Sequence, residues 1–527
     1  MEVFEIVIAL LLGGAGLAAL ARRVSTPYPA LVAVGGAALA LVPRVPTIML
    51  DPGLALALFV APVLLDAAFD ASPRDIRANW RAVTSLALGA VALTVVVVAV
   101  VTRMLVPGIP WAAAIALGAI VAPPDAAAAT AVLKQLRPPH RLLVILEAES
   151  LFNDASALLI YRVAVGAVAT GFVSGWRLLP MVAFVTLGSV ILGLVLSRGM
   201  LLVTARITDM STAVITQFCG TFAVWMLAER LHLSGILTMV VFAMATSRRA
   251  ADVIPARIRV PSYAVWEVVV FVLNVLAFIL VGFQLRLIVL RGGWQQYLGV
   301  AAAVCIATIV TRIAWVSGAA AFSRWRCRPK PDGRPGPKDA VALDARGAAV
   351  VGWCGMRGIV TLAAALALPA AFPYRDLILF TSFAVVLGTL VVQGVTLRPL
   401  LLRLGIEDDG QVEREVRLAR VETLRAALAA SARCPGAEAA ELVRQRYELL
   451  LRRAEEELLH DDSDPERHPA HPPEREIDAA VVRAATTAER QRLNALRADG
   501  TIGDAAYQLV EQELDLEELD LQQLVRA

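Results

Sequence analysis

Long apolar stretches separated by short polar segments dominate the first 405 residues of this 527-residue chain. A bilayer core of about 30 Å needs about 20 apolar residues per helix. The pattern therefore predicts thirteen membrane-spanning helices, at residues 3–20, 27–43, 50–69, 82–105, 110–133, 141–166, 178–203, 211–230, 233–248, 262–285, 294–322, 347–370 and 376–402. Beyond them, Leu and Ala at helical spacing among Arg and Glu predict exposed helices at residues 411–458, 475–498 and 504–525.

Composition and charge divide the chain into two domains. Only 18% of the residues are charged, whereas soluble domains carry roughly 25%. Residues 1–405 hold 33 Lys+Arg against 18 Asp+Glu, and residues 406–527 hold 16 against 28. We therefore expect a transmembrane domain at 1–405 and a cytoplasmic, mainly helical tail at 406–527, with a Pro/His/Asp linker near 460–473.

The pI and the cysteine spacing give no indication of a nucleic-acid partner, a disulfide framework or a zinc site. The pI of 8.7 averages two unlike regions, so it does not indicate a nucleic-acid partner. The five cysteines are scattered and none forms a CxxC pair, so neither a disulfide framework nor a zinc site is indicated.

Basic residues between the spans predict the orientation of the chain. Cytoplasmic loops carry an excess of Lys and Arg. With the N-terminus outside, the inner side collects the run from Arg324 to Arg346 and most other basic residues, whereas the outer side keeps only Arg44, Arg103, Arg177, Arg230, Arg286, Arg291 and Arg375. An odd number of spans then places the tail in the cytoplasm. Spans 1–6 and 8–13 would be inverted copies, as in many secondary transporters.

Charged residues inside the spans are candidates for function, because each costs about 2.5–3.5 kcal/mol at the bilayer centre on insertion scales. Apart from Glu5 and arginines at span ends, ten such residues stand out: Asp66, Asp125, Glu147, Glu149, Asp154, Arg162, Glu229, Glu267, Arg312 and Arg357.

Spans 5 and 12 each contain a break beside a charge. Span 5 has Pro123 and Pro124 before Asp125, and prolines remove backbone donors and disfavour helix before them. Span 12 has three glycines around Arg357. Interrupted helices at corresponding positions of two halves indicate a transporter's ion site. We expect Asp125 to face a positive half-helix end and Arg357 a negative one.

Span 6 supplies a hydroxyl and a carboxylate on one helical face. Ser150 and Asp154 are four residues apart, so they share a face. Asp154 is thirteen residues beyond Arg141, which places it about 20 Å along the helix and near the midplane. Hard oxygen ligands suit Na⁺, Li⁺ or H⁺ rather than transition metals. Because burial disfavours the charged carboxylate, a proton can compete with the cation.

Five motifs now give a resemblance to a known family. In chain order they read FVAPVLLDAA at 59–68, APPD at 122–125, EAESLFND at 147–154, AERLHLSGIL at 228–237 and GMRG at 355–358. Together they resemble the monovalent cation:proton antiporter family of NhaP-type bacterial antiporters and animal sodium/hydrogen exchangers. The resemblance covers about residues 1–403 and leaves the tail out.

The resemblance implies a fold, a mechanism and a set of roles. It implies a dimerisation domain and a mobile core domain with crossed, unwound helices, alternating access of elevator type, and a homodimer in the bacterial cytoplasmic membrane that serves pH and sodium homeostasis. It implies that Asp154 is shared by cation and proton, with Ser150 and Asp66 as further ligands. It also implies a structural ion pair between Glu149 and Arg357. The Asn153–Asp154 sequence matches the branch of the family whose exchange is electroneutral.

Two departures from the family pattern affect the expected cation preference. The family usually has Thr before the span 5 Asp, whereas this chain has Pro124; the backbone carbonyls of Ala122 and Pro124 could still face the ion. The family Glu is shortened to Asp66. Glu147, two turns from Asp154, could line an inner funnel.

The resulting hypothesis is exchange of Na⁺, or Li⁺, for H⁺ without a cofactor. A K⁺ or Rb⁺/H⁺ antiporter with the same mechanism is the near alternative. A channel would need a continuous polar pore, but the buried charges cluster at one depth. A membrane enzyme would need a nucleophile–base pair or metal ligands, and neither is convincing in the sequence.

Overall fold

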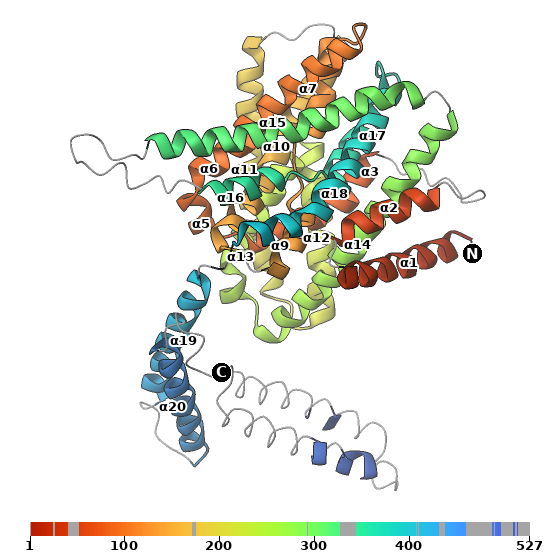
Figure 1. Ribbon diagram of the computed structural model, residues 1–527. Coiled ribbons are helices and arrows are strands. Elements are labelled where there is room, and N and C mark those ends of the chain that lie inside the picture. The colour runs from red at the N-terminus through yellow and green to blue at the C-terminus, as the bar shows by residue number, and fades with distance from the viewer. Residues whose placement is uncertain are drawn as a thin grey trace, which may run out of the picture. The chain divides into compact units, whose positions relative to one another are not determined.

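The computed structural model describes residues 2–24, 27–40, 52–136, 138–170, 175–291, 294–326, 344–406, 408, 410–431 and 438–459, and a few short stretches beyond 486. The chain forms two compact units, Met1–Asp409 and Gly410–Ala527. The described residues of both units are helical and contain no strand (Figure 1).

The first unit holds the helices that fall on the predicted spans. Its first half contains α1 Glu2–Val24, α2 Tyr28–Ala40, α3 Pro52–Ala55, η1 Leu56–Val60, α4 Ala61–Asp70, α5 Pro73–Ala78, α6 Trp80–Thr84, η2 Ser85–Ala90, α7 Val91–Leu105, α8 Trp111–Val121, α9 Ala126–Leu136 and α10 His140–Thr170. Its second half contains α11 Gly175–Thr204, α12 Met210–Arg230, α13 Gly235–Val253, α14 Ala256–Arg291, η3 Trp294–Tyr297, α15 Leu298–Arg326, α16 Ala345–Trp353, α17 Ile359–Leu366 and α18 Arg375–Leu404.

The length and hydropathy of these helices make the chain a multi-pass membrane protein. Within the described residues, six helical segments are long and apolar enough to cross a bilayer: Trp80–Leu105, Pro180–Thr204, Met210–Arg230, Ala256–Ile279, Trp294–Arg326 and Arg375–Leu404. Helix also lies in each of the other predicted ranges, including the 31-residue α10, His140–Thr170. Large apolar side chains such as Phe184, Leu187 and Ile191 are exposed on α11, as expected of a surface that faces lipid.

Two spans are interrupted where the sequence predicts a break. Residues 122–125 separate α8 from α9, and residues 354–358 separate α16 from α17. The prolines of the first break and the glycines of the second do not sustain helix, so this expectation is confirmed. The two breaks lie against each other, because the Asp125 N–H donates to the Met356 carbonyl over 2.7 Å.

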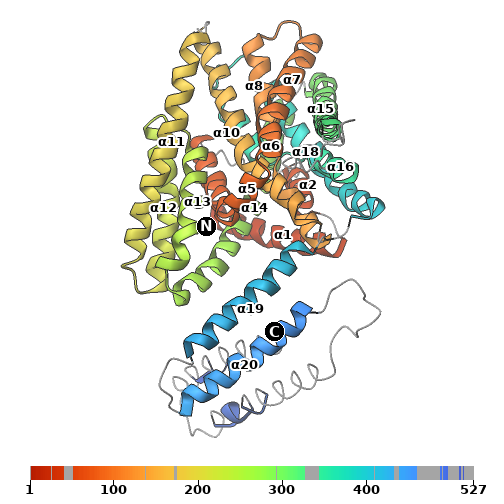
Figure 2. The ribbon, with the colours of Figure 1, turned by 90° about the vertical axis from the view of Figure 1, so that its left-hand side faces the viewer.

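The helices around these breaks pack closely. Helix α8 lies between α7 and α10, and a Cβ at Gly118 would lie only 2.7 Å from the Val95 carbonyl oxygen. Backbones approach this closely only where a small residue stands at the contact. Helices α11, α12 and α13 lie side by side as a layer at one edge of the unit (Figure 2).

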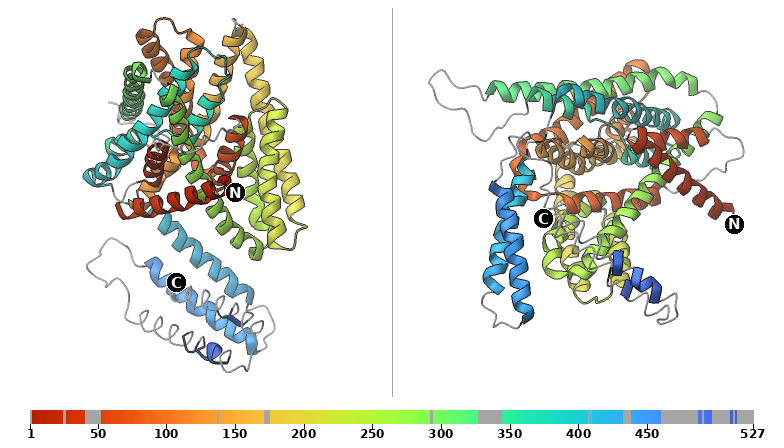
Figure 3. Two further views of the ribbon diagram at one scale, coloured as in Figure 1. Left: turned by 90° about the vertical axis from the view of Figure 1, so that its right-hand side faces the viewer. Right: turned by 60° about the horizontal axis from the view of Figure 1, so that its bottom comes forward.

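The second unit contains a helical hairpin. Its helices α19, Gln411–Ser431, and α20, Glu438–Leu459, lie side by side and are joined by an ion pair of 2.7 Å between Arg425 and Glu455 (Figure 3). Both lie where the sequence predicts helix. The linker predicted near 460–473 lies outside the described residues.

Candidate cation-binding site

Arg357 occupies the C-terminal end of the half-helix α8. Its Nε donates to the Val121 carbonyl at 2.9 Å and its Nη2 to the Ala122 carbonyl at 3.4 Å, while Nη1 binds the Gly355 carbonyl. The side chain is 1% exposed. The last carbonyls of a helix carry its partial negative charge. Arg357 therefore compensates a negative half-helix end, as the sequence predicts.

Asp125 lies at the N-terminal ends of the two other half-helices. It directly precedes α9, and its carboxylate is in contact with Gly358, the residue that caps α17. A Cβ at Gly358 would overlap the Asp125 carboxylate. Both helix ends carry partial positive charge, so the Asp125 carboxylate is stabilised there.

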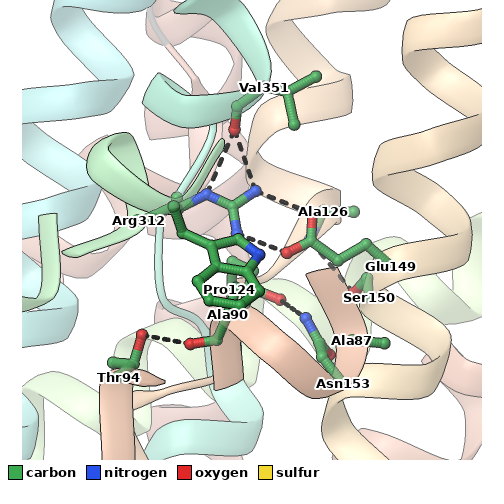
Figure 4. Close-up of polar contacts among 12 residues, drawn as sticks. Ala87, Ala90, Thr94, Pro124, Ala126, Glu149, Ser150, Asn153, Arg312 and Val351 are labelled. Atoms are coloured by element: carbon green, nitrogen blue, oxygen red, sulfur yellow. Dashed lines mark hydrogen bonds and ion pairs between the residues drawn. The ribbon is translucent and has the colours of Figure 1, made fainter. Parts of the chain in front are cut away.

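Two side chains of α10 form hydrogen bonds with the break between α8 and α9 (Figure 4). The Ser150 hydroxyl accepts a hydrogen bond of 3.3 Å from the Ala126 N–H, the first of α9. One turn further, the Asn153 side-chain amide donates to the Pro124 carbonyl over 3.2 Å. Asn153 is fully buried, and its Oδ1 has no hydrogen-bond partner in the described part of the chain.

Asp154 follows on the same helix and contrasts with these two side chains. It is 5% exposed, and within the described residues no hydrogen bond or ion pair reaches its carboxylate. Asp125 is the nearby acid whose charge acts on it. A buried ionised carboxylate needs a compensating charge or a proton. Asp154 is thus able to take up a cation or a proton.

The predicted ion pair between Glu149 and Arg357 is wrong. Glu149 binds Arg312 of α15, whose Nη1 and Nη2 reach its two carboxylate oxygens at 2.5 and 2.9 Å (Figure 4). Arg312 also donates to the Val351 carbonyl near the end of α16, at 3.2 and 3.0 Å. The physical reason is that the Arg357 guanidinium is already engaged by backbone carbonyls of α8.

The remaining predicted ligands are placed less centrally. Asp66 on α4 is exposed and lines a cavity of about 740 Å³, whereas Asp154 is not among the residues lining it. The carbonyls of Ala122 and Pro124 accept hydrogen bonds from Arg357 and Asn153, so protein donors already engage both. Glu147 is half-buried and does not line the cavity.

Two groups near the site have roles that the sequence does not reveal. The depth of Arg312 inside its span indicates a function, but its pairing with Glu149 depends on how α15 packs against α10. Tyr28 lines the cavity, shares a hydrogen bond with Asn274 and lies within electrostatic reach of Asp125. A tyrosine at a predicted span end carries no such signal, because aromatic residues are common there.

An all-helical membrane unit with two interrupted helices meeting at a buried carboxylate defines a secondary transporter rather than an enzyme. Residues 6–403 match the transmembrane domain of the sodium/hydrogen exchanger family, and the chain belongs to that family.

Relatives and solved structures agree with this assignment. A Mycobacterium tuberculosis protein described as an uncharacterised Na⁺/H⁺ exchanger is 32% identical over 78% of this chain and 76% of its own length. A sodium, potassium, lithium and rubidium/H⁺ antiporter of Bacillus pumilus is 31% identical over 76% of this chain and 61% of its own. The structure of a sodium/proton antiporter from Methanocaldococcus jannaschii matches with a TM-score of 0.60 at 18% identity, over 75% of this chain and 99% of that one.

Proposed function

We propose that this protein exchanges one monovalent cation, Na⁺ or Li⁺, for one proton across the bacterial cytoplasmic membrane. The observation that carries the proposal is Asp154, a buried carboxylate that no hydrogen bond or ion pair reaches within the described residues. It lies on α10, whose Ser150 and Asn153 bind the first break at the Ala126 N–H and the Pro124 carbonyl. Such exchange would serve pH and sodium homeostasis.

Competition for Asp154 is the proposed mechanism. The carboxylate is neutralised either by a proton or by a cation, and the cation draws further oxygen ligands from Ser150 and from Asp66. Asp125 and Arg357 remain ionised at the half-helix ends and hold the breaks in shape. No cofactor takes part, since neither partial reaction makes or breaks a covalent bond other than to hydrogen.

The proposed architecture follows the predicted topology. Thirteen crossings form two inverted six-helix repeats, with the N-terminus outside and the tail at 406–527 in the cytoplasm. The core domain carries the interrupted helices and moves past a dimerisation domain, which joins two copies of the chain in a homodimer. The match in fold to the M. jannaschii antiporter supports this arrangement.

Exchange of K⁺ or Rb⁺ by the same mechanism is the second candidate. Two relatives named for Na⁺, K⁺, Li⁺ and Rb⁺ transport favour it, at 31% and 29% identity. The replacement of a family Thr by Pro124 also removes a hydroxyl that a small ion would use.

The test is transport by the purified protein in proteoliposomes containing a pH-sensitive dye. Addition of Na⁺, Li⁺, K⁺ or Rb⁺ to acid-loaded vesicles should dissipate the pH gradient, with Na⁺ and Li⁺ most effective. A response to K⁺ and Rb⁺ of equal size would favour the second candidate. Absence of a response to all four ions would overturn antiport.

A further inference from the structure

An ion pair joins α10 to the turn between α12 and α13. Arg162 Nη2 lies 2.6 Å from Glu229 Oε1, and Arg162 Nη1 donates to the Leu233 carbonyl at 3.2 Å. The two side chains are 34% and 39% exposed. Arg162 therefore holds both the last turn of α12 and the residue that leads into α13.

The turn that Arg162 binds is itself well fixed. His232 adopts a left-handed backbone conformation with φ 56°, and the Ser234 hydroxyl caps α13 by accepting from the Leu237 N–H. The Ser234 N–H in turn donates to the Ser189 hydroxyl of α11 over 3.0 Å. Helices α11, α12 and α13 are thereby joined into one layer at this end (Figure 2).

The Glu229 carboxylate is also placed by the start of α13. A Cβ at Gly235, the first residue of that helix, would lie 3.2 Å from Glu229 Oε1. The carboxylate thus lies at the positive end of α13, which stabilises its ionised form and so favours the ion pair with Arg162.

Helix α10 links this layer to the ion site. It carries Ser150 and Asp154, and Arg162 follows Asp154 by eight residues, which is about 12 Å along the helix. Movement of the ion-site helix relative to the α11–α13 layer must therefore stretch or break the bridge between Arg162 and Glu229.

The cavity lies toward the other end of α10. Arg141, in the first turn of α10, binds Asn79, which the short helix α5 connects to the cavity-lining Asp70 at the end of α4. The cavity-lining Phe69 accepts a hydrogen bond of 2.5 Å from Ser247, in the last turns of α13. The structure is hollowed toward the Arg141 end of α10 and bridged at the Arg162 end.

We propose that the pair Arg162–Glu229 is a latch that stabilises the access state in which the cavity side is open. The latch breaks when Asp154 becomes accessible from the Arg162 side. This inference rests on the proposed alternating access, and it assigns to these two residues a part in setting the balance between the two states. A partly exposed pair contributes a modest amount, which suits a contact that must break in every cycle.

The latch predicts an asymmetric change in apparent affinity. An apparent dissociation constant equals the intrinsic one divided by the population of the competent state. If loss of the bridge shifts the two-state ratio about fivefold, the apparent KM for the cation on the Arg162 side falls about three- to fivefold. The KM on the cavity side rises by less than about twofold, because that state is already the major one.

The experiment measures cation-driven proton movement from each face in right-side-out and inverted vesicles that contain the full chain. Glu229→Gln and Arg162→Gln should both give the opposed KM shifts, and the double variant should shift no further than Arg162→Gln alone, because that change already removes the bridge. Arg230→Gln, which removes the neighbouring exposed charge, should leave both KM values unchanged. Arg162→Lys provides a charge-conserving variant should either neutral variant fold poorly.

The outcomes distinguish failure of the latch from failure of antiport. Equal KM values for wild type and variants on both faces, or shifts in the same direction on both, overturn the latch while leaving antiport intact. A double variant whose KM shifts equal the sum of the two single shifts also overturns it, because the two side chains would then act independently. A wild-type protein that moves no protons in response to any cation overturns the antiport proposal and the latch together.

Discussion

Arg312 and Glu149 form a buried, two-pronged ion pair between α15 and α10, with nitrogen–oxygen distances of 2.5 and 2.9 Å. The side chains are 3% and 1% exposed. Arg312 also binds the Val351 carbonyl near the end of α16. One guanidinium therefore joins three helices, and one of them, α10, also carries Asp154.

The first prediction concerns this pair. Glu149→Ala and Arg312→Ala should each destabilise the protein by about 3–5 kcal/mol, because either change leaves a buried charge without its partner. The double variant should lose much less than the sum of the two. Thermal unfolding of the three purified variants in detergent measures this coupling.

Arg357→Ala provides the comparison. Combined with Glu149→Ala, it should give a loss closer to the sum of the single losses, because the guanidinium of Arg357 binds carbonyls rather than Glu149. Strong coupling of Glu149 to Arg357, with none to Arg312, would contradict the pairing seen in the structure.

The sequence was sufficient to locate the interrupted helices, because proline and glycine act on their own backbone. It also placed Arg357 at a negative half-helix end and Asp125 at a positive one, since both charges stand inside the breaks. The partner of Glu149 was predicted wrongly because two buried arginines, Arg312 and Arg357, compete for it. Which one reaches the carboxylate depends on the rotation and packing of α15, and that is set by contacts between segments more than 150 residues apart.

The second prediction concerns the close approach of the two breaks. Gly358→Ala would place a methyl group on the Asp125 carboxylate, so the crossing has to shift. Transport should fall at least tenfold, and the melting temperature should drop. Gly352→Ala, in the half-helix α16 that precedes the same break, meets nothing nearer than 3.5 Å and should retain most activity. Equal activity in both variants would show that the contact between Asp125 and Gly358 does not matter.

The third prediction concerns the buried carboxylate. Asp154→Asn should abolish cation-driven proton movement, because the amide neither binds a proton in this pH range nor balances a cation. Insertion and yield should be unchanged, since the structure gives Asp154 no protein partner within its described residues. Glu147→Gln, on the same helix and half-buried, should be affected much less. Persistent exchange near the wild-type rate in Asp154→Asn would refute its role.

The fourth prediction is that exchange carries no net charge. Asn153 cannot titrate, which leaves Asp154 as the central group for which cation and proton compete. The site then has the same charge whether it is loaded with one proton or with one monovalent cation. Asp125 should not add a proton, because the half-helix ends favour its ionised form.

Asp66 is the group most able to change this proton count, since it is a second carboxylate and lines the cavity. The measurement uses proteoliposomes in which valinomycin and a K⁺ gradient set the membrane potential.

If Asp154 acts alone, the Na⁺-driven pH change keeps the same rate at every imposed potential once proton leak is subtracted. A rate that scales with the potential would mean that more than one proton moves per cation, and Asp66→Asn should then remove the voltage dependence while part of the exchange remains. Voltage dependence that survives in Asp66→Asn would place the second titrating group elsewhere and would refute the one-for-one count at Asp154.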